Sequence, residues 1–134
     1  MTNSEVFDFF ICRILHDVYE KFPCTVNLSS DEYCTLLSDA DDSKKIEMFY
    51  NTVRWLETHG YLIIGSKTLG ADFYLVSPTE KTMLIMDTIP TALKEKGKSM
   101  KQHIKDCVTA GTSDAFKDVV KTTLAMGFSA ILLP

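Results

Sequence analysis

Residues 43–62 read SKKIEMFYNTVRWLETHGYL, and this stretch decides the fold that we expect for the chain. Its apolar residues recur at steps of three and four, the spacing that places side chains on one side of a helix, and they are Ile46, Phe49, Tyr50, Val53 and Leu56. Ser43 is a suitable N-cap, and Gly60 suits the left-handed residue that ends many helices. We therefore expect a long amphipathic helix over residues 43–59, either a recognition helix or the central helix of the core.

The residues before this helix predict a helix, a short strand and a second, short helix. Thr2 and Glu5 fit a capping box, from which the first helix runs to about residue 21. Pro23 ends that helix because the residue before a proline is steered away from helical backbone angles. Residues 24–28 lean towards a β-strand, and Ser29, followed by acidic residues, is typical of a helix start.

The residues after the long helix predict a β-hairpin and further helices. Residues 61–64 and 71–76 read as strands, and the two glycines between them suit the connecting turn. The next helix is expected to start near Thr79, with that residue or Ser77 as its cap, and to end at Pro90. Two C-terminal helices follow in this interpretation, the last of them over about 115–132.

The length and composition favour one domain with an appended helical tail, and the expected elements make it an α+β, mostly helical fold. The chain has 134 residues, of which 46% are hydrophobic and 24% are charged, so general disorder is not expected. We place the domain at residues 1–90 and the tail at residues 91–134. The net charge of −4 argues against an obligate polyanion binder, although it is compatible with a local basic patch.

The cysteines and the N-terminus bear on where the protein resides. The cysteines lack the spacing of a zinc site, so we expect reduced, mostly buried thiols at Cys12, Cys24, Cys34 and Cys107. The N-terminal residues MTNSEVFDFF are acidic where a signal peptide needs positive charge. No apolar run approaches the roughly 20 residues that span a bilayer. We expect a soluble, cytoplasmic protein without a membrane partner.

The order helix, strand, short helix, long helix, hairpin and helix resembles the winged helix-turn-helix domain over residues of about 4–90. The stretch from Val53 to Ile63, VRWLETHGYLI, is similar to the end of that family's recognition helix and its entry into the wing. The stretch from Leu75 to Lys81, LVSPTEK, is similar to the return from the wing to the next helix. The resemblance implies a second helix packed across the third, with a hairpin wing beside them.

The resemblance also implies a DNA-binding surface. Helices of this type read base edges in the major groove, because Asn and Arg can form paired hydrogen bonds to adenine and guanine. A hairpin wing can contact phosphate or sugar. The residues that would carry these contacts here are Lys44, Lys45, Asn51, Arg54, Thr58 and Lys67. The function that follows is a non-enzymatic winged-helix regulator, dimeric, that binds duplex DNA through helix 43–59 and wing 65–70.

The charge distribution supports an alternative partner. Residues 28–90 contain five bases and ten acids, a net charge of −5, whereas residues 91–134 have a net charge of +3. A DNA contact in so acidic a segment lacks much of the counterion release that supplies affinity. The alternative is an acidic winged-helix module that binds a protein, as an adaptor or inhibitor. Its contact residues would be Met48 and Trp55, if they are exposed, and the acidic turn of Asp39, Asp41 and Asp42.

Residues that would support catalysis or metal binding are sparse. His16, His59 and His103 stand alone in the sequence, without an obvious Ser or Cys nucleophile. The acidic turn at 39–42 lacks the glycine and glutamate of a calcium loop. We expect no enzymatic activity, no metal and no cofactor.

The last helix predicts an oligomeric contact. Its apolar face includes Phe116, Val120, Leu124, Phe128 and Ile131. This face could pack onto its own domain or against the same helix of a second copy. Winged-helix regulators often pair through appended helices, so the resemblance favours a homodimer.

Overall fold

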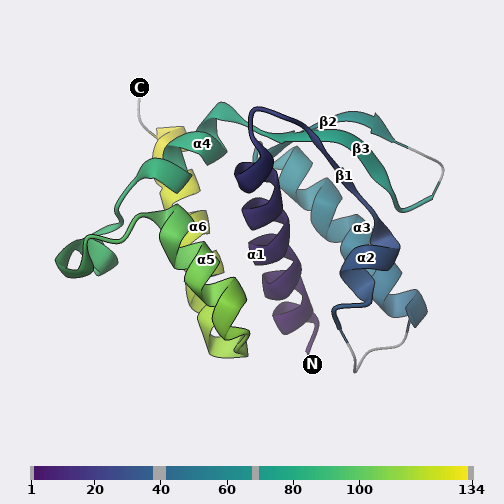
Figure 1. The fold of residues 1–134 in the computed structure, drawn as a ribbon, viewed down its shortest axis with the longest axis horizontal. Helices are drawn as coiled ribbons and strands as arrows, with labels where there is room; N and C mark the ends of the chain where they lie inside the picture. The colour runs from purple at the N-terminus through teal and green to yellow at the C-terminus, as the bar shows by residue number, and fades with distance from the viewer. Residues whose placement is uncertain (1, 38–41, 68–69, 133–134) are drawn as a thin grey trace.

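The computed structural model describes residues 2–37, 42–67 and 70–132, with side chains except at 42–43, 91–92 and 129–132 (Figure 1). It shows an α+β fold that is mostly helical. In chain order, its elements are α1 (Asn3–Lys21), β1 (Val26–Leu28), α2 (Ser30–Cys34), α3 (Asp42–Thr58), β2 (Leu62–Lys67), β3 (Phe73–Pro78), α4 (Glu80–Asp87), a 3-10 helix η1 (Thr91–Lys96), α5 (Met100–Ala110) and α6 (Ser113–Leu132). This order is compatible with a winged-helix-like arrangement.

Helix α1 lies at the centre of the molecule. Its capping box is confirmed, because the Thr2 hydroxyl accepts from the Glu5 amide and the Glu5 carboxylate accepts from the Thr2 amide. Helices α5 and α6 pack on one side of α1, and α3 and the sheet pack on the other (Figure 1). The chain is therefore arranged around its first helix, although the pattern of residues 43–62 placed α3 in that position.

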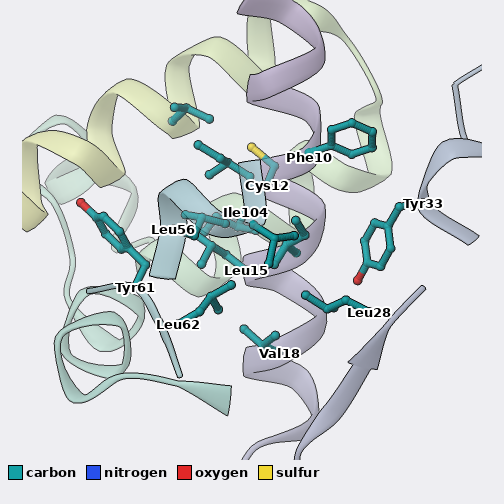
Figure 2. Close-up of a cluster of buried hydrophobic side chains, with 14 of the residues drawn as sticks. Phe10, Cys12, Leu15, Val18, Leu28, Tyr33, Leu56, Tyr61, Leu62 and Ile104 are labelled. Carbon is teal, nitrogen blue, oxygen red and sulfur yellow. The ribbon is translucent and has the colours of Figure 1, made fainter. Parts of the chain in front are cut away.

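The core is one continuous cluster of side chains from both halves of the chain. Figure 2 shows Leu15 of α1 close to Leu56 of α3 and Ile104 of α5, and all three are at most 1% exposed. Aromatic rings extend this core, with Phe49 in edge contact with Phe10 at a centroid distance of 5.4 Å. The expected boundary at residue 90 stays a prediction, but side chains on both sides of it share this core.

Helix α3 differs from the prediction at its start and agrees with it at its end. It begins at Asp42, so Ser43 lies inside the first turn and the predicted N-cap is wrong. Gly60 has the expected positive φ of 80°. The Tyr61 amide donates to the Leu56 carbonyl at 2.8 Å and the Gly60 amide donates to the Glu57 carbonyl, which together form a Schellman motif.

The first turn of α4 holds the end of α3 in place. Thr79 caps α4, and its hydroxyl also donates to the Gly60 carbonyl at 2.6 Å. The Lys81 ammonium donates to the His59 carbonyl at 2.6 Å, and the Thr82 hydroxyl donates to the Tyr61 carbonyl at 2.7 Å. The three consecutive carbonyls that follow the end of α3 therefore accept hydrogen bonds from side chains of the first turn of α4 and its cap. These bonds fix the direction in which the chain enters β2.

The sheet has three antiparallel strands in the order β1-β3-β2. The predicted hairpin is confirmed, with Leu62 opposite Pro78 and Lys67 opposite Phe73. Its turn is shorter than the predicted 65–70, because Gly65 lies inside β2. Leu75 has a φ of 55°, a value that costs energy in any residue except glycine. This distortion interrupts the strand alternation, so Phe73 and Val76 are both buried although they are three residues apart.

Membrane insertion of a helix finds no support in the described part of the chain. None of its helices combines the length and the apolar character that crossing a lipid bilayer requires.

Candidate interaction surface

Helix α3 exposes one polar stripe opposite its buried face. Phe49, Val53 and Leu56 are fully buried against α1 and the sheet. The exposed stripe follows at steps of three and four residues and contains Lys44, Glu47, Asn51, Arg54 and Thr58. Four of the six residues predicted to contact DNA therefore share one exposed face. We call this stripe, together with the adjoining hairpin residue Lys67, the α3 surface.

Glu57 connects the helix to the hairpin within the α3 surface. Its carboxylate lies 2.8 Å from the Lys67 ammonium on β2 and 3.6 Å from Arg54 Nε one turn earlier on α3. Arg54 also donates to the Tyr50 hydroxyl at 3.1 Å, and the Tyr50 ring stacks on Phe73. Two cations of the predicted DNA contact are thus already paired with one acid, in a partly exposed arrangement that costs little to break.

The prediction that Lys45 faces solvent is wrong. Only 7% of Lys45 is exposed, and its ammonium donates to the Leu37 carbonyl at 2.6 Å. The reason is helical geometry, because Lys45 precedes buried Phe49 by four residues and therefore lies on the same face. Ile46, which the apolar pattern placed in that stripe, is 38% exposed instead. In this arrangement Lys45 ties the end of the α2 region to α3 and is not available to a phosphate.

The start of α2 is occupied by an acid of the chain itself. The Asp72 carboxylate accepts from the Ser30 amide at 2.9 Å and from the Ser30 hydroxyl at 3.1 Å. Asp31 and Glu32 are exposed in the first turn of the same helix. A phosphate approaching this turn would meet carboxylates as well as backbone amides.

Met48 and Trp55 do not form the exposed patch that the protein-binding alternative required. Both are partly buried and packed against the core. The Trp55 ring makes an edge contact with Phe7 of α1 at 5.4 Å and is parallel to the Tyr61 ring at 6.1 Å. The condition set for the protein-binding alternative, that Met48 and Trp55 are exposed, is therefore not met. Asp39 and Asp41, together with the side chain of Asp42, lie outside the described residues.

An exposed apolar pair on the hairpin was not predicted. Ile63 and Leu75, which stand in the two runs that read as strands, are each 55% exposed. The Leu75 side chain lies against Gly65, because a methyl group added to that glycine would fall 2.7 Å from Leu75 Cβ. The sequence signal was the glycine itself, since a glycine inside a strand often marks a close approach of another group.

The apolar face of α6 is divided between the core and the surface. Phe116 and Val120 are at most 5% exposed and pack inside the same chain, mainly through the contact between α6 and α1. Leu124 is partly buried, and Phe128 is 62% exposed. The side chain of Ile131 lies outside the description. The expected dimer face is therefore not available as a unit, because α1 already covers its N-terminal half.

The described residues 2–37, 42–67 and 70–132 contain no group of side chains that could form a metal centre. No three His, Cys, Asp or Glu side chains come together there as they would around an ion. His16 pairs with Asp17 and His103 with Asp118, each at 3.1 Å.

No protein-family model matches the chain, and no curated protein or solved structure shows a significant match to it. The α3 surface is therefore interpreted from its own residues.

The charges around the α3 surface are nearly balanced. Across α2, α3 and β2, the described exposed or half-buried charges are three bases and four acids: Lys44, Arg54, Lys67, Asp31, Glu32, Glu47 and Glu57.

Proposed function

We propose that this chain is a non-enzymatic interaction module with a winged-helix-like arrangement, and that the α3 surface and the hairpin bind a protein partner. The order of the elements and the sheet order β1-β3-β2 support the winged-helix assignment. The observation that carries the choice of a protein is the position of Glu57 between Arg54 and Lys67. A surface whose cations are matched by its own acids offers little counterion release to DNA.

The hairpin adds an apolar contact to this surface. Ile63 and Leu75 supply exposed aliphatic area, and half of each side chain is already free of the core. Apolar side chains surrounded by charged and polar groups are typical of protein interfaces. The positive φ of Leu75 fits this role, because strained backbone positions concentrate at binding sites.

The first experiment compares DNA with protein binding. A photo-cross-linking amino acid at position 51 should yield a protein adduct in cells. The double variant I63D/L75D should lose that adduct, whereas the control L84D, at an exposed leucine of α4, should retain it. Fluorescence anisotropy with a random duplex should show no salt-sensitive binding. An adduct that survives I63D/L75D, or duplex binding that weakens steeply with salt, contradicts the proposal.

Duplex DNA is the second candidate, favoured by one observation. Asn51 and Arg54 are exposed one helical turn apart on α3, and Glu57 links Arg54 to Lys67 of the hairpin. This arrangement suits paired contacts to base edges. In that case, Glu57→Gln should strengthen duplex binding because it releases Arg54 and Lys67. Asn51→Ala with Arg54→Ala should weaken it. Binding that is unchanged by Glu57→Gln would argue against this candidate.

A homodimer through α6 would depend on Phe128. This residue is the exposed member of the expected contact set within the described side chains. Light scattering should then show a monomer for Phe128→Ser if the wild-type chain is a dimer.

A further inference from the structure

A cavity of about 400 Å³ lies between α1, β1 and α2, away from the α3 surface. Its walls include Arg13, Glu20 and Lys21 of α1, and Glu32, Tyr33 and Leu36 of the α2 region. The volume falls at the lower end of the roughly 300–1,000 Å³ typical of small-molecule sites. It therefore suits a small metabolite better than a nucleotide or a peptide.

Arg13 faces this cavity with an ion pair to Asp17 but without a hydrogen bond from its Nε. Its Nε is buried and has no hydrogen-bond partner among the described residues. The closest paired carboxylate oxygen, Asp17 Oδ2, is 3.8 Å away. That oxygen accepts a 2.6 Å hydrogen bond from the Tyr33 hydroxyl, while Asp17 Oδ1 is bonded to His16. Buried donors are rarely left unpaired, so the guanidinium is suited to an acceptor supplied by a ligand.

Opposite charge and apolar surface line the same cavity. Glu20 and Glu32 bring two carboxylates, from α1 and from α2. The Leu36 side chain is 49% exposed although it belongs to the cavity wall, and the ring of Tyr33 adjoins it. With Asp17 and Lys21 counted, the lining carries three acids and two bases, so a ligand that bears both charges finds a counterpart for each.

We propose that this cavity binds a small zwitterion, an α-amino acid with an apolar side chain. Its carboxylate accepts from Arg13, and its ammonium group lies near Glu20 and Glu32. The apolar side chain covers Leu36 and the Tyr33 ring. Because such a ligand bridges α1 and α2, and α2 packs on α3, binding fixes the position of α2. The proposal does not depend on whether the α3 surface binds protein or DNA.

Isothermal titration with the full chain tests the ligand class. The probes are leucine, isoleucine, valine, methionine and phenylalanine, with two truncated controls, 4-methylpentanoate and 3-methylbutylamine. At least one amino acid should bind saturably and raise the melting temperature. Both truncated controls should bind at least about 10-fold more weakly, since each lacks one charged group. The proposal is overturned if no amino acid binds at 10 mM, or if 4-methylpentanoate binds as well as leucine.

Two variants locate the site. Arg13→Gln removes the charge that holds the carboxylate and should weaken binding at least about 10-fold. Leu36→Trp fills the cavity from an exposed position, so it tests the site even if Arg13→Gln fails to fold. The matched controls are Arg54→Gln and Leu84→Trp, which lie outside the cavity. Affinity that is unchanged in Leu36→Trp, with a native circular dichroism spectrum, would place the ligand elsewhere.

Discussion

Gly127 of α6 lies directly against the hydroxyl of Tyr61, the residue that follows the end of α3. A methyl group added at Gly127 would collide with the Tyr61 oxygen and would lie 2.9 Å from the ring carbon that carries it. Tyr61 is 4% exposed, and its ring is also covered by the Lys81 ammonium at 4.1 Å. The C-terminal helix therefore packs against the junction between α3 and β2 through a contact that only glycine permits.

The substitution Gly127→Ala should destabilise the protein. Overpacking costs about 1–3 kcal/mol, and the better helix propensity of alanine returns about 1 kcal/mol. We expect a net loss of about 1 kcal/mol in the free energy of unfolding by urea. Tyr61→Phe in the same background removes the colliding oxygen and should recover part of this loss, since the ring carbon at 2.9 Å remains. A Gly127→Ala variant as stable as the wild type would show that α6 is not seated as described.

The Thr82 hydroxyl should contribute measurably to stability. Thr82 is 1% exposed and donates to the Tyr61 carbonyl at 2.7 Å. Thr82→Val keeps the shape and removes the donor, which should cost about 1 kcal/mol of unfolding free energy. The control is Thr109→Val, since the exposed Thr109 hydroxyl bonds only to a carbonyl of its own helix. The control should stay within about 0.5 kcal/mol of the wild type. Equal losses in the two variants would contradict the assigned role of Thr82.

The local signals in the sequence predicted the elements well. The capping box at Thr2, the left-handed Gly60 and the hairpin were all confirmed, because each depends on residues that are neighbours in the chain. The α+β, mostly helical class follows from the same signals. The resemblance to a winged helix is compatible with the sheet order and stays a prediction beyond that.

The surface of the candidate site could not be predicted equally well, because exposure depends on distant residues. Lys45 reads as a surface base, but its face of α3 is covered. Phe116 was expected in a dimer face, but α1 of the same chain packs against its helix. The pairing of Glu57 with Lys67 requires the hairpin to return beside α3, which no local pattern encodes. Lys45 is the exception among these residues, because helical periodicity from Phe49 would have identified it as inward.

The four cysteines should differ sharply in reactivity. Cys24 is exposed, whereas Cys12, Cys34 and Cys107 are buried. A hydrogen bond with Cys107, together with burial, raises the pKa of the Cys12 thiol and keeps it protonated. Iodoacetamide should therefore label one thiol rapidly in the native chain and all four in urea, and Cys24→Ser should remove the rapid phase. Rapid labelling of Cys12 in the native protein, detected by peptide mass spectrometry, would contradict this arrangement.

Asp17 should make stability depend on pH in the acidic range. Burial alone would raise its pKa, but hydrogen bonds from His16 and Tyr33 and the charge of Arg13 outweigh burial and lower the pKa. A carboxylate with a depressed pKa stabilises the fold above its unfolded value of about 3.9, and that contribution is lost as the pH falls through the folded value. Because the Asp17 side chain is 33% exposed, solvent screening limits the effect to about 1 kcal/mol.

Urea unfolding of Asp17→Asn between pH 7 and pH 3 measures this contribution. The variant should be less stable than the wild type at pH 7, and the difference should shrink as the wild-type carboxylate becomes protonated. Tyr33→Phe removes the 2.6 Å hydrogen bond to Asp17. The pKa of Asp17 should then rise towards its unfolded value, and the unfolding free energy should depend less steeply on pH. A difference between Asp17→Asn and the wild type that stays constant over the whole range would show that Asp17 is not held by these partners.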